Sequence, residues 1–381
     1  MLFEQIGLNA LLGFGLVYLF TALTRFTLKC KRPKNYPHGP PTQPILGNLL
    51  DIPLKKPFLV FQSLAKKYGD IVGLKVGPTN LILLNDPLVV RELFEKRGVK
   101  YSDRPYNYIV DKNIVPREQG HSLHIIFMNR DEPWRRWRAA VRHLLGPAGC
   151  EQVSPIQGAV AASLVRDILL DPKQHLDHIR RWGLVTPFVS ICGRRNVDEK
   201  TVHDFYETQH LWLDLLEPGK TPPVDAVPFL RWIPHSLAKW KQDAAFVHDN
   251  QRKFYDDLLA SARKQLAAQA IPSKGAKIKY ECLMAKILRE DKAGEWSDQK
   301  MAYLGGGLLD AAVDTTVSSL EALLVAMATH PEVQMRTQEE IDHVCGDNPP
   351  QVEDLKQLPY LRACLLEVGS NPARACRRRH T

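Results

Sequence analysis

The chain has little cysteine and no paired cysteine motif. Its seven cysteines are scattered through 381 residues, and no two of them form a C-x-x-C pair. A disulfide framework needs an even, regularly spaced set, and a structural zinc site needs closely paired ligands. The sequence therefore argues against both, and it predicts that the main domain folds in a reducing compartment. His121 and His124, which have no carboxylate or cysteine at ligand spacing, are interpreted as loop residues.

Charge is missing from one stretch near the N-terminus. Residues 5–24, QIGLNALLGFGLVYLFTALT, contain no charged side chain. A helix of that length spans about 30 Å, the thickness of the hydrocarbon core of a bilayer. Glu4 precedes the stretch and basic residues follow it, at Arg25, Lys29, Lys31, Arg32 and Lys34. This asymmetry predicts a membrane anchor with the remaining chain in the cytosol, rather than a cleaved signal peptide or a buried helix.

The overall composition is that of a folded, basic protein. Apolar residues make up 44% and charged residues 24%, while the formal net charge is +9. Such a charge favours an anionic partner, although a solvated basic surface explains it equally well. Lys and Arg beside the anchor would attract anionic membrane lipid. A nucleic-acid partner is a poor explanation, because the charge is dispersed, no recognition motif is present and a membrane span precedes the domain.

The patterning after the anchor is mainly helical. Residues 25–57 are basic and proline-rich, which predicts a semi-rigid hinge. Helical patterns at 58–68 and 87–98 flank a predicted hairpin around Gly77, and residues 101–130 have no clear period. Further helices are predicted at 134–145, 156–170, 175–192, 199–216, 236–268, 280–290, 298–330 and 331–344. No internal repeat is visible. The sequence thus predicts a mainly α fold with a small β-sheet.

The long helix 298–330 carries unusual residues. It contains Gly305, Gly306 and Gly307, and glycine in a helix costs about 1 kcal/mol relative to alanine, so a close-packing reason is expected. Asp314 and Thr315 place a carboxylate and a hydroxyl among apolar neighbours, where polar groups need partners. Two explanations remain open: a functional site, or threonines that bond back to the preceding turn of their own helix.

The segment Ala311-Ala312-Val313-Asp314-Thr315-Thr316 resembles the A-G-x-D/E-T-T signature of cytochrome P-450 monooxygenases, with alanine in place of the usual glycine. Other segments resemble the same family in the same order. They are the hinge YPHGPPTQPILGNLL, the segment FQSLAKKYGDIVGLKVGPTNLILLNDPLVVRELFEKRGVKYSDRP, the W-x-x-x-R helix PWRRWRAAVRHLL, and the helices HPEVQMRTQEEIDHV and EDLKQLPYLRACLLEV. The likeness extends to Val368 and is greatest with the fungal microsomal type.

The resemblance implies a haem b cofactor and roles for particular residues. Trp134 and Arg138, one turn apart on a helix, would hold a haem propionate. Ala311 and Ala312 would leave room over the flat cofactor, and Asp314 and Thr315 would relay protons for the reduction of dioxygen. The loop 109–127, the region 218–234 and the turn 305–309 would line the pocket of a small apolar substrate.

The resemblance also implies partners and a cellular place. Electrons would come from NADPH through NADPH–cytochrome P-450 reductase, an acidic partner received on the basic face of Arg135, Arg136 and Arg142. The protein would sit in the endoplasmic reticulum membrane as a single-pass protein with a cytosolic catalytic domain. Its expected parts are the anchor 1–24, the hinge 25–57, an incomplete catalytic domain 58–368 and an aberrant tail 369–381.

The family pattern breaks after Val368. Glu367 would open the E-x-x-R motif, but Ser370 stands where its arginine belongs, and the F-x-x-G-x-R-x-C-x-G segment is missing. Cys376 lies in an R-x-C fragment without the surrounding glycines, so it is not expected to ligate iron. Codons for GSNPARACRRRH, read one base later, can spell VPTRLVPVGGVT, which suggests a shifted reading frame. The sequence predicts a chain that is inactive as it stands; the alternative is a non-catalytic membrane-anchored remnant or scaffold.

Overall fold

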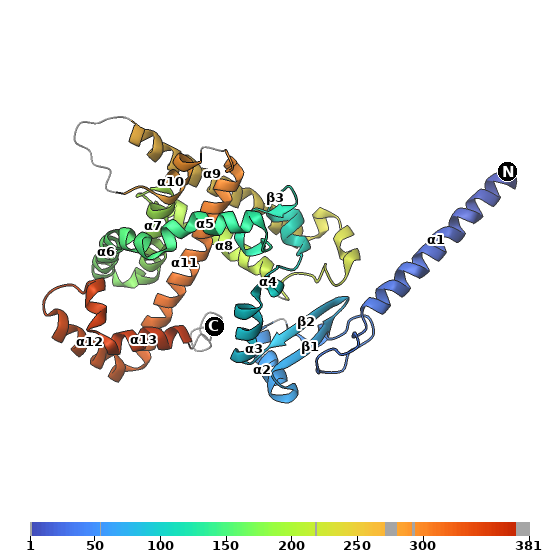
Figure 1. Ribbon diagram of the computed structural model, residues 1–381, viewed down its shortest axis with the longest axis horizontal. Coiled ribbons are helices and arrows are strands. Elements are labelled where there is room, and N and C mark those ends of the chain that lie inside the picture. Colours follow the sequence, from blue (N-terminus) through green and yellow to red (C-terminus); the bar gives the residue numbers. More distant parts are fainter. Residues whose placement is uncertain (1, 54, 218, 271–279, 292–293, 371–381) are drawn as a thin grey trace. The chain divides into compact units, whose positions relative to one another are not determined.

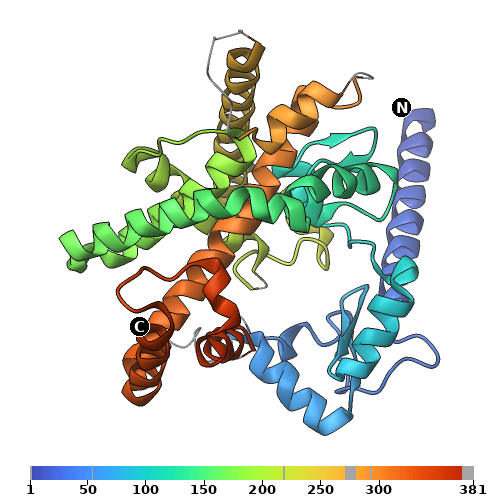
Figure 2. The ribbon, with the colours of Figure 1, turned by 60° about the vertical axis from the view of Figure 1, so that its left-hand side comes forward.

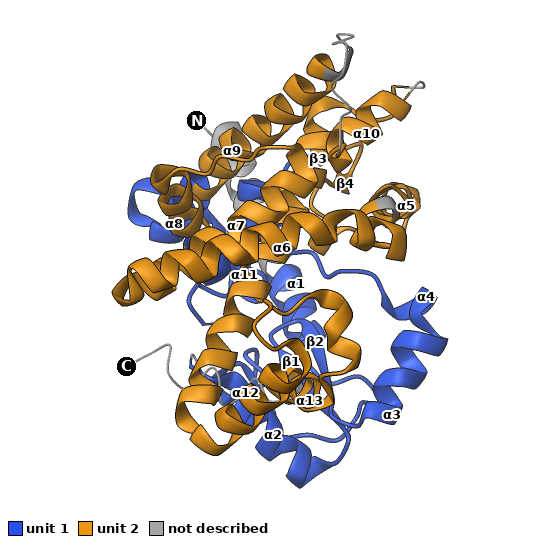
Figure 3. Cartoon of the chain, turned by 90° about the vertical axis from the view of Figure 1, so that its left-hand side faces the viewer, with its two compact units in different colours: residues 1–116, 211–246 blue, residues 117–210, 247–381 orange. Residues whose placement is uncertain are grey.

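A computed structural model describes residues 2–53, 55–217, 219–270, 280–291 and 294–370 (Figure 1). The chain divides into two compact units (Figure 3). Unit 1 comprises residues 1–116 and 211–246, and unit 2 comprises residues 117–210 and 247–381. Cys376 and the rest of the predicted tail from residue 371 lie outside the described residues.

Unit 1 contains the long helix α1, a hairpin and a series of shorter helices. In chain order these are α1 (Leu2–Lys29), η1 (Leu49–Asp51), α2 (Pro57–Tyr68), β1 (Ile71–Val76), β2 (Thr79–Leu84), α3 (Pro87–Val90), the π-helix η2 (Arg91–Lys96), α4 (Gly98–Tyr101), the π-helix η3 (Val110–Ile114), η6 (Pro228–Trp232) and η7 (His235–Leu237). β1 and β2 pair antiparallel from Ile71–Leu84 to Val76–Thr79, as the hairpin prediction requires. The turn uses Gly77 at φ +54°, where an added Cβ would lie 3.2 Å from Ala226.

Unit 2 holds most of the helical mass. Its elements are β3 (Arg117–Glu118), β4 (His121–Ser122), η4 (Ile125–Phe127), α5 (Glu132–Leu145), α6 (Pro147–Leu170), η5 (Pro172–Gln174), α7 (His175–Cys192), α8 (Glu199–Leu216), α9 (Lys239–Ala270), α10 (Leu283–Glu290), α11 (Asp298–Thr329), α12 (Pro331–Cys345), η8 (Val352–Lys356) and α13 (Pro359–Ser370). α8 ends and α9 begins within unit 1. α7 packs along α11, and α6 packs on α7 in turn (Figure 2). The prediction of a mainly helical fold with few strands is confirmed.

Some boundaries differ from the sequence prediction. α1 continues past Thr24 to Lys29, so the start of the predicted hinge is helical. The irregular stretch 101–130 contains η3, the β3–β4 hairpin and η4, which makes a second two-stranded sheet. α13 runs through Gly369 and Ser370, two residues expected to lie beyond the end of the helix.

The glycine run of α11 has the close-packing role that the sequence predicted. A Cβ on Gly306 would lie 2.2 Å from the ring of Tyr255, and one on Gly305 would lie 2.6 Å from the sulfur of Met284. Gly307 faces His124, and a Cβ at this position would lie 3.6 Å from Nε2 of the imidazole. Glycine at 305 and 306 therefore lets α11 approach α10 and α9 closely, whereas at 307 a Cβ would make only an ordinary contact.

Two helices in the described part are long and apolar enough to cross a membrane by length and composition alone, namely α6 and α11. The N-terminal half of α11 is buried in unit 2, from Met301 to Asp310. The stretch of α11 that meets the criterion is nonetheless only 11% buried, as is that of α6.

Candidate functional site

The candidate signature lies where α11 changes from buried to accessible. Every residue from Met301 to Asp310 is buried, whereas Ala311 and Thr315 are exposed, and Ala312 and Asp314 are half-buried. Ala311 and Thr315 are four residues apart, so they lie on the same face of the helix. This face is made of small side chains and one hydroxyl, which leaves room for a large flat ligand above the backbone.

Thr315 and Asp314 point in different directions from α11. The Thr315 hydroxyl donates to the carbonyl of Ala311 at 2.8 Å, which is the back-bonding that the sequence left open. A hydroxyl that donates to its own helix keeps its lone pairs for accepting a hydrogen bond on the exposed side. Asp314 lies near Tyr206 of α8: burial raises the pKa of Tyr206, and the charge of Asp314 adds to the shift. The pair thus offers an inner carboxylate and an outer hydroxyl on adjacent residues.

Trp134 and Arg138 come together on α5 as predicted. Asp131 caps this helix by accepting from the backbone N–H of Trp134 at 3.1 Å, and its second oxygen contacts His121 Nδ1 at 2.6 Å. Arg138 Cζ lies 5.8 Å from the centre of the Trp134 ring. Within the described residues Arg138 makes no ion pair, whereas Arg135 and Arg136 both pair with Glu132. Arg138 is therefore available to an anionic group, as a haem propionate is.

The described residues include features that would suit one side of a haem. The exposed face of α11 and the donors on α5 suit a flat, dianionic ligand. An iron-binding cysteine must be a thiolate, yet burial raises the pKa of Cys192 to about 11 and that of Cys282 to about 12. Cys30 and Cys345 are also buried with raised pKa values. Burial thus makes these four thiols weaker acids and less ready to form the thiolate that iron requires.

Sequence reasoning missed a buried polar cluster next to the signature. Tyr255 donates to Asp310 Oδ2 at 2.6 Å, and His124 Nε2 lies 3.5 Å from the same oxygen. The sequence predicts only that His124 lies in a loop, whereas in the structure its side chain is fully buried. Burial together with the Asp310 charge raises the pKa of Tyr255. The one signal in the sequence was Asp310 itself, a carboxylate inside an apolar helix.

Comparison with known proteins agrees with this geometry. The family model for cytochrome P-450 matches residues 37–368. The chain belongs to the cytochrome P-450 family, whose members are haem-dependent oxidoreductases.

Several similar proteins are fungal monooxygenases of this family. The chain is 33% identical over 359 residues to the cytochrome P-450 monooxygenase fogE of Aspergillus ruber, an alignment that covers 93% of this chain and 64% of that protein. It is 30% identical to yanC of Aspergillus niger, over 93% of this chain and 65% of that protein. It is 31% identical to atE of Aspergillus terreus, over 89% and 62% respectively. The chain therefore spans less than two thirds of the length of these relatives.

Proposed function

We propose that this protein derives from a monooxygenase that inserts one oxygen atom of O2 into a small apolar substrate in fungal secondary metabolism. The observation that carries the proposal is the accessible face of α11, where Thr315 and Asp314 lie beside Ala311 and Ala312. The relatives, each named as a cytochrome P-450 monooxygenase, support the same reaction class. Electrons would come from NADPH through NADPH–cytochrome P-450 reductase.

Each residue has a separate part in this proposal. Trp134 and Arg138 donate to a propionate and fix the orientation of the haem, which, when bound, supplies the redox chemistry of dioxygen activation. Asp314 and Thr315 would together relay protons to the accessible face, with the carboxylate of Asp314 acting from its half-buried side of α11. The hydroxyl of Thr315 would act on the exposed side, since a hydroxyl both donates and accepts.

These roles can be tested in a chimera in which Val368 is followed by the C-terminal segment of fogE. Thr315→Ala should consume NADPH but release hydrogen peroxide in place of product, and Asp314→Asn should slow turnover with less uncoupling. Ser319→Ala is the matched control, because Ser319 is also exposed and also bonds back to its helix, at 2.8 Å. Wild-type coupling in Thr315→Ala would remove Thr315 from the site.

For the present chain we propose that iron is not held by a thiolate. The rival function is that of a non-catalytic, membrane-anchored remnant or scaffold. The carbon-monoxide difference spectrum of the reduced, haem-supplemented protein is the test, and no thiolate-type band is expected. A clear band of that type would show that Cys376 or another cysteine ligates the iron.

We further place the protein in the endoplasmic reticulum membrane through α1, as a single-pass protein with its catalytic domain in the cytosol. Phe14 and Tyr18 of this helix are 77% and 76% exposed, and Thr21 and Thr24 bond back to carbonyls of the same helix. Exposed apolar side chains with internally satisfied hydroxyls suit a lipid environment. Deleting residues 1–24 should release the protein from carbonate-washed membranes, and retention would refute the anchor.

A further inference from the structure

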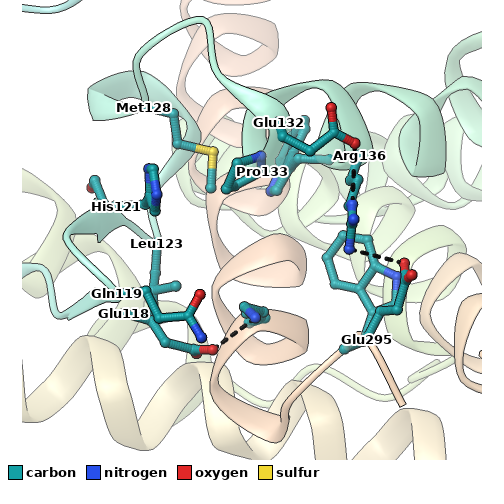
Figure 4. A pocket seen from close by; sticks show the side chains of 13 residues that line it. Glu118, Gln119, His121, Leu123, Met128, Glu132, Pro133, Arg136 and Glu295 are labelled. Carbon is teal, nitrogen blue, oxygen red and sulfur yellow. Dashed lines mark hydrogen bonds and ion pairs between the residues drawn. The ribbon is translucent and has the colours of Figure 1, made fainter. Parts of the chain in front are cut away.

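A cavity of about 290 Å³ lies within unit 2, apart from the candidate catalytic face (Figure 4). Its walls come from the β3–β4 hairpin, the first turns of α5, and residues 295, 296 and 300 before and within the first turn of α11. None of Trp134, Arg138, Asp314 and Thr315 lines it. Because α11 rises 1.5 Å per residue, Lys300 and Thr315 are roughly 20 Å apart along the helix.

The inner wall of the cavity is apolar and aromatic. It is formed by Leu123, Met128, Pro133, Trp137 and Trp296. Trp137 is 4% exposed, and its indole N–H has no hydrogen-bond partner among the described residues. A buried donor without a partner costs about 1–3 kcal/mol, so an acceptor that reaches this N–H from the cavity after a small rotation of the ring would recover stability. Two indoles and a thioether favour a flat aromatic ligand.

The rim carries charges that already neutralise one another. Glu118 pairs with Lys300 at 2.7 Å, and Arg136 pairs with both Glu132 and Glu295 at 3.2 Å (Figure 4). Lys300 beside Glu118 also lowers the pKa of that carboxyl. The rim therefore has three carboxylates and only two permanent cations, which disfavours an anionic ligand and offers acceptors for a ligand hydroxyl.

We propose that this cavity binds a neutral hydroxylated aromatic molecule, of roughly two fused rings at the packing density of protein interiors. The rings would lie against Trp137, Trp296 and Met128. The ligand oxygen would accept from Trp137 N–H, and its hydroxyl would donate to a rim carboxylate. Part of the loop that the sequence assigned to the substrate pocket, from Glu118 to Leu123, thus lines a second binding site. Binding in this cavity requires neither haem nor the proposed reaction.

The test uses the full chain in lipid nanodiscs, with empty nanodiscs as the blank for partition into lipid. Titration with 2-naphthol should quench tryptophan emission and give saturable heat of binding. Naphthalene, which lacks the hydroxyl, should bind about 10-fold more weakly, and the anion 2-naphthalenesulfonate weaker still. No saturable binding of 2-naphthol, or tighter binding of the sulfonate, would refute the proposal.

Variants then locate the site. Leu123→Trp fills the cavity and should abolish binding, whereas Leu145→Trp, at an exposed position at the end of α5, should not. Trp137→Phe keeps the ring but removes the N–H, and should weaken binding about 5- to 30-fold, even if Leu123→Trp fails to fold. Ala311→Phe obstructs the α11 face and should leave binding unchanged. Wild-type affinity in a folded Trp137→Phe, or loss of binding in Ala311→Phe, would overturn the assignment.

Discussion

The two halves of α11 have the same secondary structure and opposite environments. From Met301 to Asp310 every residue is buried, and glycines fit against Tyr255 and Met284. From Ala311 onward one face is accessible, with Ala311, Thr315, Thr316 and Ser319 exposed. In the first half the side chains are dictated by packing. In the second half packing demands less, so polar side chains such as those of Asp314 and Thr315 are accommodated there.

The largest expected effect comes from enlarging a packed glycine. Gly306→Leu would drive a side chain into the Tyr255 ring, which an added Cβ alone approaches to 2.2 Å, so we expect a loss of about 3 kcal/mol or more in the free energy of unfolding. Ala311→Leu, on the exposed half, should cost less than about 1 kcal/mol. Urea unfolding followed by circular dichroism measures both. Equal losses would show that the two halves do not differ in packing.

The next effect concerns the buried cluster around Asp310. Tyr255→Phe removes the hydroxyl that donates to Asp310 Oδ2 and should cost about 1–3 kcal/mol, because a buried carboxylate loses a donor. Tyr303→Phe is the matched control. Tyr303 is equally buried, but its hydroxyl has no hydrogen-bond partner among the described residues, so the substitution should be neutral or stabilising. A larger loss in Tyr303→Phe than in Tyr255→Phe would contradict this account of the cluster.

These contrasts show which features the sequence could predict. The bounds of α7 and α8 were predicted to the residue, because both helices are long and turn-forming residues separate them. The signature residues and the Trp134–Arg138 pair could be proposed from the sequence, since their spacing is local. His124 was missed because its burial depends on contact with Gly307, far away in sequence. The cavity beside Trp137 was missed for the same reason, since three separate segments meet there.

Alkaline pH should destabilise the core around the buried half of α11, because the buried thiols of Cys192 and Cys282 lie in that core. In the unfolded chain these thiols lose protons near the ordinary value of 9.0, but in the folded protein their pKa values are about 11 and about 12. Between these pH values the unfolded state binds fewer protons, so stability is full below pH 9 and declines as the pH rises toward 11–12. Within this range each thiol should lower the free energy of unfolding by at most about 1.4 kcal/mol per pH unit.

This pH effect can be isolated by substitution. The Cys192→Ala/Cys282→Ala variant will have a constant packing loss at all pH values, but it should lose less stability than the wild type between pH 9 and pH 11. Cys150→Ala, which removes an exposed thiol, should follow the wild-type curve. Parallel curves for the double variant and the wild type would show that neither buried thiol contributes to alkaline unfolding.

Thr315 has the smallest expected effect on stability and the largest proposed effect on the reaction. Thr315→Ala removes a bond to the Ala311 carbonyl that competes with helix geometry, and alanine is the better helix former, so the free energy of unfolding should change by no more than about 0.5 kcal/mol. Thr337→Ala, which removes a buried hydroxyl that donates to the Val333 carbonyl at 2.8 Å on α12, is the comparison inside the core, and there packing should cost more. Thermal melts of both variants provide the measurement. A loss above about 1.5 kcal/mol in Thr315→Ala would mean that this hydroxyl stabilises the fold. Any uncoupling seen in the chimera would then have to be attributed to a disturbed helix rather than to a missing proton carrier.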